Sequence, residues 1–445
     1  MFRMKVNSGY AKELPRKKKK DLPAPIPINQ GLDLQGLRHS PLSYLAHIWI
    51  FIPAFVFFKV LNDNAVNVPI LDDYDAILNF LHDFKAASFI NKLVLLFSQH
   101  NEHRILHSRL LYISYYSLFG DINFRNIIFL GNLQLLPIFL VSIYFIRKTV
   151  DRYWSILSFI WALCIFDLNT YGNAITSMTA VQNYGVVMFF FITLFLYSLD
   201  RKYIIPAAVF QFVGIFSSGN GILASLVVAI YTLFGNDKVK KITSVSITVV
   251  FSLLYFLHYV PPSSATPADP NGFNVGTAVR FIIKMIGDPL DFDSAFLWGI
   301  VILIVLAAVF PYKNIRLNSK ILPQVFIAGF CMATILASGY FRSNLKGVVP
   351  QTSRYLIYPQ LLLASIASFI FLKVKGKKIQ LPAIIVLSVI MLKVYRGNYE
   401  FGKSGFEREA FKAQTRHYYY PDTVRAKRIA QEASAAGIYS LEEER

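Results

Sequence analysis

Long apolar stretches alternate with polar loops along most of the chain, and the loops are of two chemical kinds. One kind is short and rich in Lys and Arg, and the other is longer and holds most of the acidic, His and amide side chains. A helix needs about 20 apolar residues to cross a bilayer. The pattern therefore predicts an all-α, polytopic transmembrane helical bundle of about 11 spans. The expected spans are Tyr44–Leu61, Asn126–Ile146, Tyr153–Asp167, Asn183–Leu199, Ile204–Phe216, Ile222–Phe234, Ile242–Val260, Ser294–Phe310, Ile321–Ser338, Tyr355–Leu372 and Leu381–Val394.

The charged loops predict the orientation of the chain. Arg16 to Lys20 read RKKKK, and when this arm is placed in the cytoplasm every loop on the same side is basic, as in Lys373–Lys378. Cationic loops remain on the cytoplasmic side of membrane proteins. We expect a multi-pass protein of the cytoplasmic (inner) membrane, with a disordered cytoplasmic arm over residues 1–43, a transmembrane domain over 44–395 and an exoplasmic tail over 396–445.

Composition supports a membrane protein and narrows the function classes. Hydrophobic residues make up 55% of the chain and charged residues 16%, whereas soluble domains carry about 25% charged residues. The net charge of +19 is split among many loops rather than gathered on one module, so we expect no nucleic-acid partner. Cys164 and Cys331 both lie in apolar spans, which predicts neither a disulfide framework nor a metal cluster.

An acidic cluster follows soon after the first span. Leu71-Asp72-Asp73-Tyr74-Asp75 places three carboxylates within four positions. Neighbouring carboxylates repel, so one of them tends to have a raised pKa, and such a group can act as a general base toward an acceptor hydroxyl. The alternative is that Asp72 or Asp73 caps the helix that follows. Both are candidate catalytic residues.

A second cluster lies in the same long loop, between stretches whose apolar period predicts interfacial helices. It reads Gln99-His100-Asn101-Glu102-His103-Arg104, with His107 beyond it. On a helix the three histidines would share one face, which suits a divalent metal, a substrate phosphate or lipid headgroups. The HExxH order of metalloproteases is absent, so we assign no metal ligands and leave a divalent cofactor open. The candidate substrate ligands are His100, Glu102, His103 and Arg104.

Three later outer loops add candidate ligands for a sugar and a phosphate. Asn169–Gln182 is rich in amides and hydroxyls, which bind sugars, or it is a plain polar turn. Ser217–Gly221 is either a tight turn or a helix break that admits a ligand. Gly339–Arg354 carries outer cations, explained by a bound phosphate or by snorkelling to lipid. The residues concerned are Asn173, Gln182, Asn220, Arg342, Lys346, Arg354 and Tyr355.

The chain resembles the GT-C superfamily of membrane glycosyltransferases, and in particular a bacterial branch associated with surface polysaccharides. The resemblance rests on the inside N-terminus, the long first outer loop and the pair Asp72-Asp73. It also rests on four motifs: FSQHNEHRILHSRL (Phe97–Leu110), NAITSMTAVQNYG (Asn173–Gly185), SSGNG (Ser217–Gly221) and TSRYLIYP (Thr352–Pro359).

This resemblance implies inverting transfer of a sugar from a polyprenyl-phosphate carrier to a hydroxyl of a cell-surface glycan or glycolipid, on the exoplasmic face. Asp72 or Asp73 would be the base, and Arg342, Lys346 and Arg354 would hold the phosphate. One alternative is a polysaccharide polymerase or ligase that acts on a lipid-diphosphate glycan and needs no acidic pair. Another is a lipid-linked glycan transporter, but few ionisable residues lie within the spans, where transporters place them.

Overall fold

The computed structural model describes residues 47–261, 273–312, 319–345, 348–349, 353–374, 376–416 and 418–440. The predicted arm over 1–43 and the candidate ligand Lys346 lie outside the described residues. Within them the chain is helical except for one two-stranded hairpin. The all-α prediction is confirmed.

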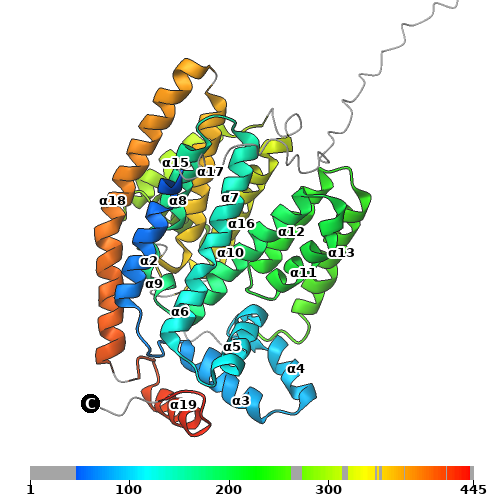
Figure 1. Cartoon of the computed structure of the whole chain (residues 1–445), viewed down its shortest axis with the longest axis vertical. Coiled ribbons are helices and arrows are strands. Elements are labelled where there is room, and N and C mark those ends of the chain that lie inside the picture. Colours follow the sequence, from blue (N-terminus) through cyan, green and yellow to red (C-terminus); the bar gives the residue numbers. More distant parts are fainter. Residues whose placement is uncertain are drawn as a thin grey trace, which may run out of the picture.

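Each predicted apolar span lies largely on a helix of the bundle in Figure 1. These helices are α2 (Ile52–Asn64), α6 (Phe124–Leu133), α7 (Leu135–Thr149), α8 (Trp154–Ile165), α10 (Ser177–Ser198), α11 (Ile204–Ile215), α12 (Gly221–Leu233), α13 (Lys238–Tyr255), α15 (Ala295–Val309), α16 (Leu322–Arg342), α17 (Ile357–Lys373) and α18 (Lys377–Thr415). The connecting segments form η3 (Tyr74–Asn79), α3 (Phe80–Ala86), α4 (Phe89–Phe97), α5 (Leu106–Phe119), η4 (Leu168–Thr170), α9 (Tyr171–Ala174), α14 (Val275–Gly287), η7 (Ser353–Tyr355) and α19 (Thr423–Ala435).

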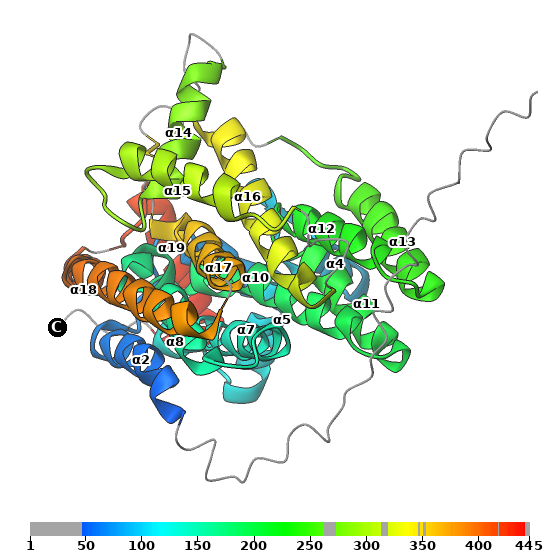
Figure 2. The ribbon, with the colours of Figure 1, turned by 90° about the horizontal axis from the view of Figure 1, so that it is seen from above.

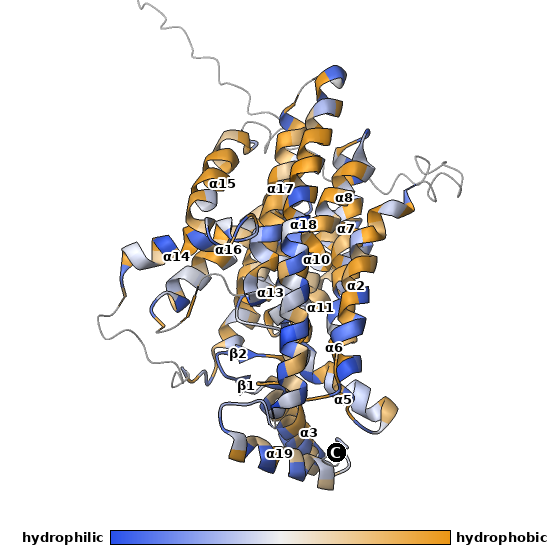
Figure 3. Cartoon of the chain, turned by 90° about the vertical axis from the view of Figure 1, so that its left-hand side faces the viewer, coloured by the Kyte–Doolittle hydropathy of each residue, from blue (hydrophilic) through white to orange (hydrophobic). Residues whose placement is uncertain are grey.

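Several of these helices are long and apolar enough to cross a membrane. Among the described residues, five segments meet this description, at Phe124–Thr149, Trp154–Ala174, Ser177–Ser198, Leu322–Arg342 and Lys378–Thr415. Gly221–Leu233, Ala295–Val309 and Ile357–Lys373 are shorter apolar helices. Apolar residues dominate α7, α8, α15 and α17 in Figure 3, whereas α19 is more polar. Membrane association therefore follows from the helices themselves.

α10 is the central helix of the bundle. Its side chains are mostly buried, and it packs against α6, α7, α11 and α12. Seen from above, the remaining apolar helices surround it and α17 (Figure 2). Gln182 and the residues around it are therefore enclosed by protein rather than by lipid.

Two predicted spans differ from the observed helices. The span Asn126–Ile146 is divided at Gln134 into α6 and α7, because Pro137 has no N–H to donate to the carbonyl of Leu133. The last span continues as α18 to Thr415, so the predicted domain boundary at residue 395 falls inside a helix. Gly402 permits this extension, since a Cβ there would lie 2.4 Å from the carbonyl carbon of Leu168.

The C-terminal tail folds back onto the segment after the first span. The predicted tail helix is present as α19, which packs on η3 and α3 at the lower end of the bundle in Figure 1. The N–H of Leu71 donates to the carbonyl of Tyr419 at 2.8 Å. The guanidinium of Arg425 lies 2.6 Å from the carboxylate of Asp75. The tail thus fixes the turn that carries the acidic cluster.

Candidate functional site

The cluster at residues 99–104 is a β-hairpin and not a helix, so the predicted shared helical face of its histidines is wrong. β1 (Gln99–His100) pairs with β2 (His103–Arg104), which places His100 opposite His103. Asn101 takes the left-handed conformation, with φ of 47°, a conformation that Asn tolerates in tight turns. His107 lies apart from the hairpin, on α5, with Nε2 3.0 Å from the Gln134 side chain.

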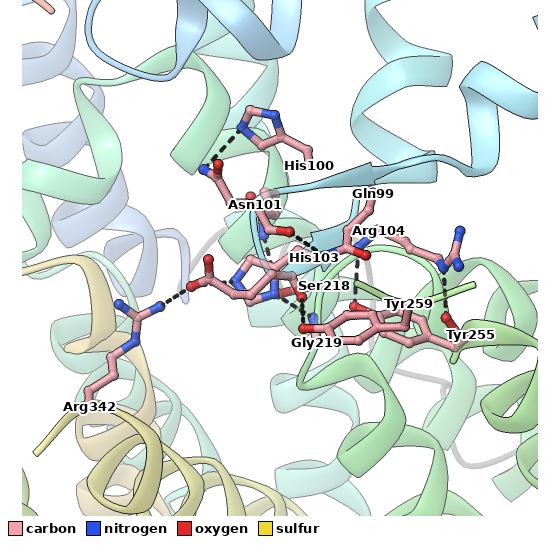
Figure 4. Close-up of polar contacts among 12 residues, drawn as sticks. Gln99, His100, Asn101, His103, Arg104, Ser218, Gly219, Tyr255, Tyr259 and Arg342 are labelled. Carbon is pink, nitrogen blue, oxygen red and sulfur yellow. Dashed lines mark hydrogen bonds and ion pairs between the residues drawn. The ribbon is translucent and has the colours of Figure 1, made fainter. Parts of the chain in front are cut away.

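Arg104 holds the hairpin against the end of α13. Its Nε donates to the carbonyl of Tyr255 at 2.7 Å, and Nη2 donates to the carbonyl of Leu257 at 2.6 Å. Nη1 donates to the carbonyl of Phe97. Because the guanidinium is buried and occupied by backbone carbonyls, we assign Arg104 a positioning role and remove it from the predicted substrate ligands (Figure 4).

Glu102 and His103 project from the hairpin toward two other segments. The Glu102 carboxylate accepts a hydrogen bond from Nη2 of Arg342 at 2.7 Å and lies 3.6 Å from Nε2 of His103. Nδ1 of His103 accepts the N–H of Gly219 at 3.2 Å, in the turn between α11 and α12 (Figure 4). The hairpin therefore joins the 217–221 turn to the end of α16. The 217–221 segment is a tight turn, as one of the two predictions held.

The electrostatics of this pair follow from its surroundings. Burial lowers the pKa of His103 to about 4, so the imidazole is neutral near pH 7. Because Nδ1 accepts a hydrogen bond, the proton is on Nε2, facing Glu102. Burial works to raise the pKa of Glu102, but the charge of Arg342 and its hydrogen bond oppose this rise, and the net shift is downward. Glu102 is therefore an anion paired with Arg342.

Tyr355 lies beside the contact between the hairpin and the end of α16. The Arg342 guanidinium lies over its ring, 5.0 Å from the centroid. Burial raises the pKa of the Tyr355 phenol, the charges of Arg342 and Arg354 oppose this rise, and those of Glu102 and Asp72 add to it. Among the described residues the Arg354 side chain has no ion-pair or hydrogen-bond partner. We call Asp72, Glu102, His103, Arg342 and Tyr355 the polar cluster.

The two candidate bases have different environments. Asp73 is fully buried, and its carboxylate accepts the N–H of Ile70 at 3.0 Å and that of Met178 at 2.7 Å. Burial raises its pKa to about 7. Asp73 thus ties its turn to the start of α10. It does not cap η3 with its side chain.

Asp72 is only partly buried, and its carboxylate has no hydrogen-bond or ion-pair partner within the part of the chain that the structure describes. Burial lowers the pKa of His100, and the charge of Asp72 opposes this effect. The same charge acts on His103 and Tyr355. Of the two aspartates, Asp72 is the one within electrostatic reach of the polar cluster and free to accept a proton.

The predicted amide ligands lie in a buried layer beside the polar cluster. Asn220 donates to the Tyr358 hydroxyl at 2.7 Å. Gln182 donates to the Ser218 hydroxyl at 3.3 Å. The Oδ1 of Asn173 accepts from Asn183 at 2.7 Å, and its Nδ2 has no partner among the described residues. These amides connect α9, α10, α12 and α17.

Sequence reasoning missed the residues that hold the cluster together. Tyr358 and Tyr255 lie in apolar stretches of the sequence that predict helices and no polar role. Gly219 reads as a turn residue, although a Cβ there would lie 2.9 Å from Nδ1 of His103. Only the close approach of the hairpin explains that glycine, and the sequence carries no signal for a contact between positions so far apart.

Comparison of the chain with protein-family models and with curated proteins finds no match. The described residues hold no group of three or more His, Cys, Asp or Glu side chains that could bind a metal ion. The polar cluster combines a paired guanidinium and a neutral imidazole with the carboxylate of Asp72, whose charge acts on His103 and Tyr355.

Proposed function

We propose that the chain is a GT-C-type membrane glycosyltransferase of about 11 spans. It transfers a sugar from a polyprenyl-phosphate carrier to an acceptor hydroxyl of a cell-surface glycan or glycolipid, at the exoplasmic face of the cytoplasmic membrane. The proposal is carried by the contact of Arg342 with Glu102 and Tyr355, which joins positions some 240 residues apart, and by the charge of Asp72, which acts on Tyr355.

Arg342 is suited to hold the carrier phosphate. A guanidinium has five N–H donors, and the structure uses one of its terminal nitrogens for Glu102. Stacking on Tyr355 keeps the guanidinium plane fixed, and a fixed planar fork favours paired hydrogen bonds to phosphate. Arg354 supplies a second positive charge nearby. As the bond between the anomeric carbon and the phosphate oxygen breaks, these charges stabilise the negative charge that grows on the leaving phosphate.

Asp72 is suited to be the general base. It accepts the proton of the acceptor hydroxyl while the hydroxyl oxygen bonds to the anomeric carbon, on the side opposite the departing phosphate. This geometry inverts the configuration of the sugar. His103 is neutral and held by the Gly219 N–H, so it positions Glu102 or a sugar hydroxyl rather than competing for the proton.

The exposed face of α4 supports access from the bilayer. Phe89, Ile90 and Val94 are each more than half exposed, and Lys92 lies on the same short helix. An amphipathic helix of this kind lies in the headgroup plane. α4 packs beside α5, which follows the hairpin directly. A lipid carrier embedded in the outer leaflet would thus reach the polar cluster laterally.

The test is sugar transfer in reconstituted vesicles. The donor is a radiolabelled polyprenyl-phosphate sugar, and the product is extracted and separated from the donor. We expect transfer by the wild-type chain and by Asp83→Asn, whose half-exposed carboxylate lies on α3, but not by Asp72→Asn. A chain that uses only an oligosaccharide-diphosphate carrier, and keeps its activity in Asp72→Asn, would instead be a polymerase or ligase.

A further inference from the structure

A second polar site lies away from the polar cluster, between α8, α17 and α18. A cavity there is lined by Asp167, Gln360 and Tyr395 among apolar side chains that include Cys164 and Met391. It encloses about 220 Å³ between atoms, its open mouth included. The space within it holds about one water-sized species, so this cavity suits a single small ion rather than a sugar or a lipid headgroup.

Three polar side-chain atoms in this cavity lack partners. Gln360 is 1% exposed, and neither Oε1 nor Nε2 has a hydrogen-bond partner within the described residues. The Tyr395 hydroxyl has none there either. Buried polar groups are almost always hydrogen-bonded, because each unpaired group forfeits its hydration. The unpaired oxygens of Gln360 and Tyr395 line one cavity, which indicates a bound species that these oxygens coordinate.

Two buried acidic side chains at this site have no basic partner among the described residues. Asp167 is 4% exposed, and Asp288, next to the lining residue Pro289, is 2% exposed. No Lys, Arg or His of the described residues forms an ion pair with either carboxylate. Burial raises the pKa of Asp288 to about 7, and the charges of Asp167 and Asp291 add to that rise. A buried anion needs a counter-charge or a proton.

The arrangement around Asp167 leaves it ready for a ligand. Oδ1 accepts the N–H of Asn169 at 2.8 Å, and Oδ2 accepts from Nδ2 of Asn398 at 2.9 Å. The same Nδ2 donates to the carbonyl of Pro289 at 3.0 Å. Two carboxylate oxygens offer about four acceptor positions, so Asp167 is oriented by the protein and still has unused lone pairs.

We propose that this cavity binds a small hard cation of the sodium or calcium class. Asp167 supplies the charge, Oε1 of Gln360 and the Tyr395 hydroxyl supply neutral oxygens, and Asp288 adds a second negative charge at the edge. An all-oxygen donor set selects hard cations over zinc or copper. The cation fixes α8, α17 and α18 to one another beside η4. The proposal goes beyond sugar transfer and does not depend on it.

The test measures cation binding by the full-length chain in detergent. Thermal unfolding is followed while NaCl or CaCl₂ replaces choline chloride at constant ionic strength. We expect a saturable rise in unfolding temperature with at least one of the two cations. Asp167→Asn keeps an acceptor for the Asn169 N–H. It should raise the cation concentration needed for half of the effect at least about tenfold. Glu400→Gln, an exposed carboxylate on α18, is the matched control and should respond like the wild type.

Gln360→Leu separates a bound cation from an empty or protonated cavity. If the cavity is a cation site, this variant loses the cation-dependent rise. If no cation binds, removing an unpaired buried amide stabilises the chain equally in every salt, and that result overturns the proposal. Equal unfolding temperatures of the wild type in choline, sodium and calcium would overturn it too.

Discussion

Asn substitutions at Asp72 and Asp73 should have opposite consequences, although the two residues are adjacent. Asp72→Asn removes a carboxylate that no described residue binds, so the free energy of unfolding should change by less than about 0.5 kcal/mol. A general base contributes about 10²- to 10⁴-fold to a rate. We therefore expect Asp72→Asn to lower kcat by that factor and to fold normally.

Asp73→Asn should act on the fold instead. The carboxylate accepts two backbone N–H groups, from Ile70 and Met178, whereas an Asn side chain has one oxygen and presents an NH₂ group to the other donor. Leaving one buried donor unpaired costs about 1–3 kcal/mol. The variant should unfold at lower temperature, while the folded fraction loses far less activity than Asp72→Asn.

The assay combines thermal unfolding in detergent with sugar transfer normalised to folded protein. The reasoning is refuted if Asp72→Asn keeps full kcat, or if Asp73→Asn is as stable as the wild type. If the two variants were equally inactive and equally stable, both carboxylates would act in the chemistry and the structural role of Asp73 would be wrong.

Four further predictions concern the ion pairs and the pH dependence. Arg342→Met should lower kcat/KM for the lipid donor by about 10- to 150-fold, since a hydrogen bond to a charged group is worth about 1.5–3 kcal/mol. If kcat and the donor KM are unchanged, Arg342 does not bind the donor. Glu102→Gln frees Arg342 from a partly exposed ion pair worth up to about 1 kcal/mol, so donor KM should fall by up to about fivefold, and a rise would mean that Glu102 binds the sugar. Asp75→Asn breaks the contact with Arg425 and should expose the C-terminal tail to protease. The control Asp422→Asn should not, because an Asn side chain still caps α19. Folding raises the pKa of Asp73 from 3.8 to about 7. The stability that the Asp73 carboxyl contributes is therefore fully present below about pH 4 and is lost as the pH rises through 7. Urea unfolding from pH 4 to 7 should show the wild type losing stability relative to Asp73→Asn.

The helices were predictable because their signal is local. Apolar runs long enough to cross a bilayer had to pair their backbone groups internally, and each of them lies largely on a helix. The ends of the helices were harder to predict. Pro137 divides one run, and α18 continues past residue 395 because small residues such as Gly402 let it pack on η4.

The candidate site was predictable in its members and not in its arrangement. The polar segments between the apolar runs gave their acidic, histidine and arginine residues as candidates, among them Asp72, Glu102, His103 and Arg342. The turn at Asn101 converts the expected helix into a hairpin, and a left-handed Asn has only a weak sequence signal. The roles of Asp73 and Arg104 depend on backbone groups that lie near them only after folding, so no local pattern could assign them.

The position of the carrier phosphate decides whether the polar cluster is the catalytic site. A cryo-EM map of the chain with a polyprenyl-phosphate sugar bound in a nanodisc would show it. We expect the phosphate within hydrogen-bond distance of Arg342, with the anomeric carbon facing Asp72. A phosphate bound at the opposite end of the bundle, near the basic Lys373–Lys378 loop, would contradict it.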